Sequence, residues 1–155
     1  MFNVILLHPQ IPQNTGNIAR LTAGTGAKLH IVLPMGFTIT DSKLKRAGLD
    51  YWDKVDLTIH ENWEDCVKVT SNGFNNYYFA STKGEKYYSE VAYRPGDCII
   101  FGSEDEGMPA EYYSKYVAGL ITIPMRSDSV RSINLSNSVA IILYEAYRQN
   151  DFVMI

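Results

Sequence analysis

The sequence is poor in cysteine and has no apolar stretch long enough to span a membrane. Its two cysteines, Cys66 and Cys98, lie far apart, and Cys98 falls in an apolar, strand-like run, so we expect buried thiols rather than a disulfide. The apolar residues 2–7 run directly into His8 without a signal-peptide cleavage pattern. These features predict a cytoplasmic protein with no membrane partner, and a length of 155 residues predicts a single domain over residues 1–155.

Positive charge is also scarce, because the formal net charge is −3. Taken alone, this balance argues against nucleic acid, since neutralising phosphates requires clustered lysine and arginine. Two clusters exist nevertheless: Lys43 and Lys45 with Arg46, and Arg126 with Arg131. The first could be a phosphate-contacting face or a solvated helix surface, so the overall charge leaves the partner undecided.

Several common enzyme signatures are absent. The sequence contains no GxSxG elbow, no Ser-His-Asp order, no Walker loop and no GxGxxG fingerprint. Their absence excludes the commonest hydrolases, P-loop nucleotide hydrolases and nicotinamide-cofactor enzymes. His8, His30 and His60 show no metal-ligand spacing, and the consecutive acidic residues 104–106 do not converge on a cation without a special loop. We therefore predict no metal site.

Apolar runs alternate with helical patterns along the chain. We predict strands at residues 2–7, 28–33, 56–60, 76–80, 97–101 and 120–123. We predict a helix opening at residues 14–16, a short basic helix capped by Asp41, a helix over 61–69 with Asn62 as N-cap, and one from Pro109 through Tyr113. Residues 8–13 are excluded from helix by their prolines, and the tyrosine-rich segment 85–94 is left unassigned.

Strand, helix and strand within the first 33 residues form a βαβ unit. The fold class is therefore α/β, a mostly parallel sheet with helices on both faces. Ligands of such sheets bind beyond the carboxyl ends of the strands. We expect the polar loops that follow Leu7, Ala80, Phe101 and Ile123 to converge there.

The segment from Leu120 to Arg148 joins a buried strand, a polar loop and an unusually apolar helix. The loop 125–138 is rich in serine, asparagine and arginine, which suits a polar ligand. Asn137 or Ser136 can cap the helix that follows. Because apolar side chains fill more than one side of this helix, we expect one side to pack on the sheet and another on a second subunit.

Two other loops have the composition of a binding site. In NTGNIAR (14–20), Asn14 and Asn17 lie at a helix N-terminus, with Arg20 one turn further in. This pattern can bind an anion or substrate on free backbone N–H groups, or can be a capped helix with a solvated arginine, and by itself it leaves both open. In the turn 102–109, we expect the backbone to embrace a ligand and Glu104 to orient neighbouring groups.

Four segments together resemble one family: NTGNIAR (14–20), LKRAGLDYW (44–52), FGSEDEGMP (101–109) and IPMRSDSVRSINLSNSVAIILYEAYRQ (123–149). They are similar to the motifs of the SPOUT superfamily of RNA methyltransferases, in its small single-domain branch, the tRNA (cytidine/uridine-34) 2'-O-methyltransferases. INLSN followed by the apolar helix is the most specific element, and RAGLDY indicates this branch. The resemblance implies a deep trefoil knot in the C-terminal part of the sheet, and a homodimer through the C-terminal helix.

The resemblance also implies S-adenosylmethionine as the cofactor and tRNA as the partner. Carried over by position, the cofactor contacts fall on Ala80, Gly102, Ile123, Ser132 and Leu135. The expected substrate contacts are Arg20, Lys43, Arg46, Arg131 and Tyr144.

The implied reaction transfers a methyl group from a sulfonium to a ribose 2'-hydroxyl, which requires a base within about 3 Å of that hydroxyl. The resemblance points to Arg20 as this base. Since a guanidinium is nearly always protonated, the alternative is that Arg20 positions the adjacent phosphate while another group removes the proton. Asn14, Glu104 and Asn134 are expected to hold Arg20 and the ribose in register, with Ser132 near the substrate.

Other functions stay open on the same scaffold. They are 2'-O-methylation of ribosomal RNA, and a non-catalytic role in RNA binding or assembly. An unrelated nucleotide-binding module is disfavoured because the glycine fingerprint is missing.

Overall fold

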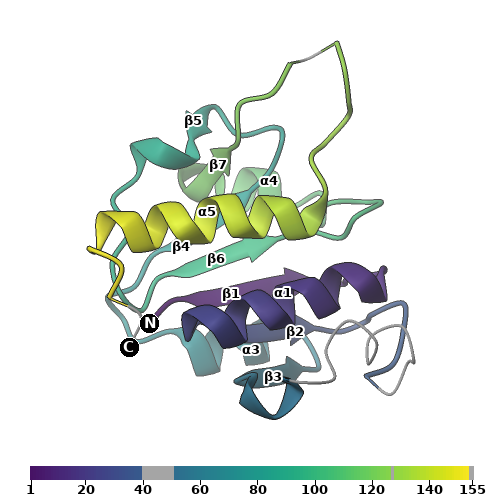
Figure 1. The fold of residues 1–155 in the computed structure, drawn as a ribbon. Coiled ribbons are helices and arrows are strands. Elements are labelled where there is room, and N and C mark those ends of the chain that lie inside the picture. The colour runs from purple at the N-terminus through teal and green to yellow at the C-terminus, as the bar shows by residue number, and fades with distance from the viewer. Residues whose placement is uncertain (40–50, 127, 154–155) are drawn as a thin grey trace.

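The computed structural model describes residues 1–39, 51–126 and 128–153 (Figure 1). Within them, seven strands form one sheet in the order β3-β2-β1-β6-β4-β7-β5, and every neighbouring pair is parallel. The strands are β1 (Asn3–Leu7), β2 (Lys28–Val32), β3 (Leu57–His60), β4 (Tyr77–Ala80), β5 (Lys86–Tyr87), β6 (Cys98–Phe101) and β7 (Leu120–Thr122). All except β5 were predicted to within one residue at each end, because buried parallel strands are continuous apolar runs.

Helices cover both faces of this sheet, as the alternating pattern predicted. They are α1 (Pro12–Thr25), α3 (Trp63–Thr70), α4 (Tyr112–Lys115) and α5 (Leu135–Gln149), with short 3-10 turns η1 (Trp52–Lys54), η2 (Tyr88–Glu90) and η3 (Val117–Gly119). Figure 1 shows α1 and α5 lying side by side across one face, with α3 and α4 behind the sheet.

The two faces have separate apolar cores, which alternate along each strand. Val4 and Leu6 of β1 belong to the core under α1 and α5, whereas Ile5 and Leu7 belong to the core that contains Trp63 of α3. These four side chains are at most 1% exposed. A central strand buried on both faces holds the carboxyl edge of the sheet in a fixed place, and that edge carries the candidate site.

The structure tests three predictions about helix ends: the starts of α1 and α4, and the cap of α3. Residues 8–11 lie outside the helix, as predicted, but the exclusion of residues 12 and 13 was wrong. α1 begins at Pro12, where proline is tolerated because the first N–H of a helix has no partner anyway. The helix predicted from Pro109 begins only at Tyr112, whose N–H donates to the Pro109 carbonyl at 3.0 Å to close a turn. The Asn62 cap of α3 is confirmed, since its side chain accepts from the Asp65 N–H at 2.9 Å.

Other expectations for the fold have different outcomes. The basic helix after Asp41, including Lys43 and Arg46, lies outside the described residues. β6 lies between β1 and β4, and β7 lies between β4 and β5, so the C-terminal strands interleave with earlier ones. The trefoil knot itself stays a prediction.

Over the described ranges, no helix combines the length and apolar character needed to cross a membrane.

Candidate functional site

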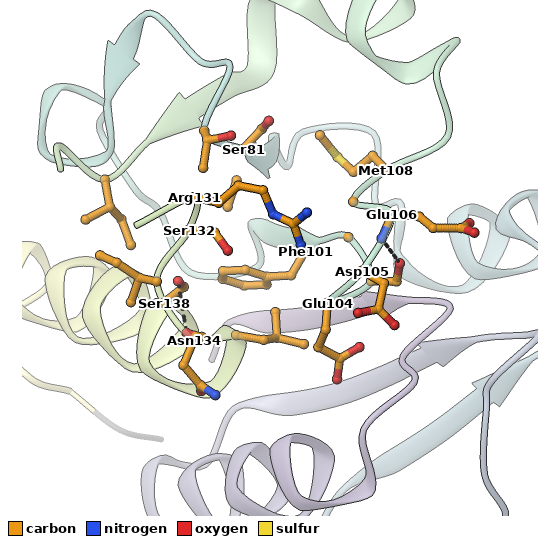
Figure 2. A pocket seen from close by; sticks show the side chains of 18 of the residues that line it. Ser81, Phe101, Glu104, Asp105, Glu106, Met108, Arg131, Ser132, Asn134 and Ser138 are labelled. Carbon is orange, nitrogen blue, oxygen red and sulfur yellow. Dashed lines mark hydrogen bonds between the residues drawn. The ribbon is translucent and has the colours of Figure 1, made fainter. Parts of the chain in front are cut away.

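A pocket of about 380 Å³ opens at the carboxyl ends of β4, β6 and β7 (Figure 2). Its walls come from the ends of these strands, the loops that follow them and the N-termini of α1 and α5. The volume falls in the range of sites that take a nucleoside-sized ligand. The convergence of strand-end loops that the sequence indicated is therefore present, although the loop after β1 contributes only through Ile11.

The five residues predicted to contact a cofactor all line this pocket: Ala80, Gly102, Ile123, Ser132 and Leu135. They come from three strand ends, the loop before α5 and the first turn of α5, so only the folded sheet brings them together. Asn14, Glu104, Arg131 and Asn134 line the same pocket. Figure 2 shows Arg131 and Ser132 on one side of the pocket and the acidic turn 104–106 on the other.

Gly102 allows two backbone segments to approach closely at the pocket wall. A Cβ on Gly102 would lie 2.3 Å from the carbonyl carbon of Gly107, and real Cβ atoms do not come so near. Ser103 and Gly107 exchange backbone hydrogen bonds of 3.0 Å in both directions, and Gly107 has φ of 70°. Residues 102–107 therefore form a tight turn at the pocket wall, and binding of a ligand by its backbone stays a prediction.

Glu104 caps α1 from a distant part of the chain. The N-cap residue of α1 is Ile11, whose side chain cannot accept a hydrogen bond, and the first turn of α1 holds no acidic residue. The Glu104 carboxylate accepts from the backbone N–H of Gln10 at 2.8 Å and of Ile11 at 3.1 Å. A negative charge beside a helix N-terminus is also favoured by the helix dipole. The contact explains why this turn stays beside α1.

Asn14 links Glu104 to the start of α5. Its Nδ2 donates to Glu104 at 3.2 Å, and its Oδ1 accepts from Asn134 Nδ2 at 3.0 Å. Asn14 is 5% exposed, so its amide has few alternative partners. We call Glu104, Asn14 and Asn134 the amide relay. The relay joins three elements that lie far apart in sequence at the rim of the pocket.

Asn134 is also the N-cap of α5. Its Oδ1 accepts from the Ser136 N–H at 2.9 Å, the Ser136 Oγ at 2.7 Å and the Asn137 N–H at 3.4 Å. The expectation that Asn137 or Ser136 caps this helix is therefore wrong, because both lie inside its first turn. An asparagine cap leaves Nδ2 available, and here that group donates into the relay.

Two predicted substrate residues lie outside the lining of the pocket in the described part of the chain. Arg20 is exposed on α1, with its guanidinium carbon 5.7 Å from the centroid of the Tyr51 ring. The Tyr51 hydroxyl donates to the Gly16 carbonyl at 3.2 Å, which fixes this ring against α1. Tyr144 is 45% exposed on α5. Their assigned roles stay predictions.

The structure adds pocket residues that the sequence analysis did not select. Lys83 and Tyr113 both line the pocket, and the Lys83 ammonium lies 4.3 Å from the centroid of the Tyr113 ring. Residues 81–84 immediately follow β4, so position after a strand was the available signal for Lys83. Nothing in the sequence pattern marks Tyr113, which had been assigned to a helix.

Comparisons with known proteins agree on one family. The sequence model of the SpoU rRNA Methylase family matches residues 1–144. The tRNA (cytidine(34)-2'-O)-methyltransferase of Methylovorus glucosotrophus is 44% identical over 153 residues, which cover 98% of this chain and 97% of that protein. A solved structure concerned with 2-OH methylation of C/U34 on tRNA is 40% identical, has a TM-score of 0.87, and matches over 97% of each chain.

A more distant structure shares only the fold. The SpoU methyltransferase AviRb of Streptomyces viridochromogenes, solved in complex with AdoMet, is 19% identical with a TM-score of 0.82. The match covers 96% of this chain and 60% of that one.

Proposed function

This chain belongs to the SpoU rRNA Methylase family, and from that premise we propose that it transfers a methyl group from S-adenosylmethionine to the ribose 2'-hydroxyl of the wobble nucleotide of tRNA, a cytidine or uridine at position 34. The name of the Methylovorus glucosotrophus relative and the subject of the C/U34 structure support this substrate, since both match nearly the whole chain. The observation in the structure that carries the proposal is the pocket, which gathers every residue expected to contact the cofactor.

The pocket has the chemistry that S-adenosylmethionine requires. Phe101, Ile123 and Leu135 supply apolar surface for a purine, while Ser132 and the backbone of the Gly102 turn supply polar groups. AdoMet is bound by AviRb, which has the same fold. When bound, the cofactor supplies an electrophilic methyl group on a sulfonium.

The residues of this chain then have to orient the acceptor ribose. We assign this task to the amide relay, because its three side chains line the pocket and hold one another by hydrogen bonds of 3.0 to 3.2 Å. Alignment of hydroxyl, methyl and sulfur can supply much of the acceleration, since well-oriented reactants reach effective molarities of about 10⁵ M or more. No cation is needed in this scheme to polarise the hydroxyl.

Arg20 has two possible tasks, removal of the hydroxyl proton or contact with the phosphate beside the ribose. Its exposure supports the second, because a solvated guanidinium keeps its charge and is a strong phosphate ligand. The stack on Tyr51 holds that charge at a fixed place on α1.

A second copy of the chain completes this proposal. Tyr144 is exposed on α5, beside half-buried Ile141, so this face of the helix offers aromatic and aliphatic surface to a partner. We propose a cytoplasmic homodimer that packs through α5, next to α1 and its Arg20.

The test is a methylation assay with labelled S-adenosylmethionine and unmodified anticodon stem-loops. We expect label on the 2'-oxygen of nucleotide 34, mapped by mass spectrometry. Label elsewhere, or none on any isoacceptor, would contradict the proposal. Ribosomal RNA in the same assay tests the alternative substrate, which the name of the SpoU rRNA Methylase family suggests.

Variants separate an enzyme from a non-catalytic RNA-binding factor. Arg20→Ala should abolish turnover while cofactor binding, measured by calorimetry, is retained. Arg94→Ala is the matched control, because Arg94 is also exposed but lies before the amino end of β6, at the edge of the sheet away from the pocket. A binding factor instead predicts that Arg20→Ala keeps both RNA binding and the cellular phenotype.

A further inference from the structure

Three potential metal ligands meet in the core on the opposite side of the sheet from α1 and α5. They are His30 of β2, His60 of β3 and Cys66 of α3, which are 3%, 4% and 0% exposed. One nitrogen from each histidine and the Cys66 sulfur all lie within 4.8 Å of one another. No residue of this cluster lines the methyl-transfer pocket.

The pairing of β2 with β3 creates this cluster. Val32 pairs with His60, and His30 lies two residues before Val32 on the same face of β2. The two histidines are therefore diagonal neighbours beneath α3, although they are thirty residues apart in sequence. Sequence spacing did not indicate this pair, because it does not register contacts between neighbouring strands.

Hydrogen bonds determine which nitrogen of His30 has a free lone pair. Asn3 Nδ2 donates to the Gly96 carbonyl at 3.0 Å, so Asn3 Oδ1 faces His30 Nε2, 3.3 Å away. Because that oxygen can only accept, His30 Nε2 carries the proton and Nδ1 presents its lone pair to His60 Nε2 at 3.0 Å. Metal-binding histidines commonly have their second nitrogen oriented in this way by an outer acceptor.

We propose that His30, His60 and Cys66 form a structural binding site for a zinc-like divalent transition-metal ion. Two imidazole nitrogens and one thiolate are a borderline-soft donor set that suits Zn²⁺, with water as the fourth ligand. Binding would release the Cys66 thiol proton to solvent and move the His60 proton from Nε2 to Nδ1, so one proton leaves for each ion bound. The oxidation state of the metal does not change.

The geometry requires only small shifts of the ligand atoms. Ligand atoms about 2.0 to 2.3 Å from a tetrahedral zinc ion lie roughly 3.3 to 3.8 Å from one another. The two histidine nitrogens, now 3.0 Å apart, would separate slightly, and the Cys66 sulfur, within 4.8 Å of both, would approach them where it lies farther away than this range. An ion here would join α3 to β2 and β3, and would stabilise the fold without taking part in methyl transfer.

Cobalt titration of the full-length protein tests the proposal. After dialysis against a chelator, Co²⁺ should bind one ion per chain, produce a near-ultraviolet thiolate-to-cobalt band with visible tetrahedral bands, and be displaced by Zn²⁺. Zinc should also raise the thermal unfolding midpoint of the wild-type protein. Absence of the thiolate band at millimolar Co²⁺ in the wild-type protein would overturn the proposal, whatever any variant does.

The two cysteines provide matched variants. Cys66→Ala should lose the thiolate band, while Cys98→Ala should keep it, because Cys98 is equally buried and belongs to the same core but not to the cluster. A band that persists in Cys66→Ala would place the metal elsewhere and refute the assignment. If Cys66→Ala does not fold, His60→Gln tests the same loss through a second ligand.

Discussion

Replacement of Asn134 should separate the stability of α5 from the chemistry of the pocket. The Oδ1 of this residue caps α5 through three hydrogen bonds, while its Nδ2 donates to Asn14. In Asn134→Asp the capping oxygen remains and the donor becomes an oxygen. Asn14 cannot repair the loss by turning its amide, because its Nδ2 would then leave Glu104 and its Oδ1 would face that carboxylate.

The magnitudes follow from the contacts that each variant removes. Asn134→Ala loses a cap, which costs about 1 kcal/mol, and a hydrogen bond of about 1 kcal/mol. Asn134→Asp keeps the cap, but its carboxylate oxygen would face Asn14 Oδ1, which adds repulsion to the lost hydrogen bond. Asn134→Ser loses only the second contribution, since serine is as good a cap as asparagine, so it is the variant to compare with alanine. For a chain of this size, about 1 kcal/mol lowers the unfolding midpoint by roughly 2 to 4 °C. We therefore expect a midpoint decrease about twice as large in the alanine variant.

Turnover should depend on the hydrogen bond from residue 134 to Asn14 rather than on the cap of α5. If the relay positions the ribose, Asn134→Asp should reduce kcat by about a hundredfold, the scale expected when a reacting group is misplaced by about 1 Å. Thermal unfolding followed by circular dichroism gives the stability, and single-turnover methylation of an anticodon stem-loop gives the rate. Asn134→Ser is the control, because serine also caps but is too short to reach Asn14 and adds no charge. Full activity in both the Asp and Ser variants would refute a role for the relay, and equal destabilisation of the Ser and Ala variants would refute the cap.

Three further predictions test other parts of the structure. Gly102→Ala should weaken S-adenosylhomocysteine binding by about tenfold in calorimetry, because its Cβ would lie 2.3 Å from Gly107 and overpacking costs about 1 to 3 kcal/mol. Gly24→Ala is the control and should show no such loss, because its Cβ would meet nothing within 4 Å. Tyr147→Phe should lower the free energy of unfolding by about 1 to 2 kcal/mol in urea titrations, because its fully buried hydroxyl donates to a backbone carbonyl at 2.7 Å; an unchanged value would show that this bond adds nothing. Burial, with a smaller effect of the neighbouring histidine, lowers the pKa of His30 from 6.5 to about 4, so in metal-free protein its contribution to stability is present above about pH 6.5 and is lost as the pH falls toward 4. The free energy of unfolding should decrease by about 2 kcal/mol between about pH 7 and pH 5, and His30→Gln should remove most of that slope.

Composition and periodicity were sufficient to predict six of the seven strands in the described sheet. The strands are continuous apolar runs, and parallel strands carry their following loops to one edge, so the gathering of Ala80, Gly102 and Ile123 in one pocket could be expected from their places after strands. The start of α1 could not be predicted, because a proline is equally compatible with the interruption of a helix and with its first position.

Contacts between distant residues account for the rest. Glu104 caps a helix that begins more than ninety residues earlier, and His30 meets His60 only because two strands align in a particular register. Local patterns contain no information on either. The cap of α5 was missed for a simpler reason. Four of the five residues 134–138 are polar and could each cap a helix, and the actual cap also forms a hydrogen bond outside its helix.

The cap on α1 has a consequence for how this protein folds. The amides of Gln10 and Ile11 acquire their acceptor only after β6 has added to the sheet and residue 104 has arrived beside them. The beginning of α1 should therefore fray in any state in which the second half of the chain is unformed. Hydrogen exchange at these two amides would report when the second half of the chain joins the sheet. Pulse labelling during refolding should find them protected late, together with the strands formed by that half of the chain.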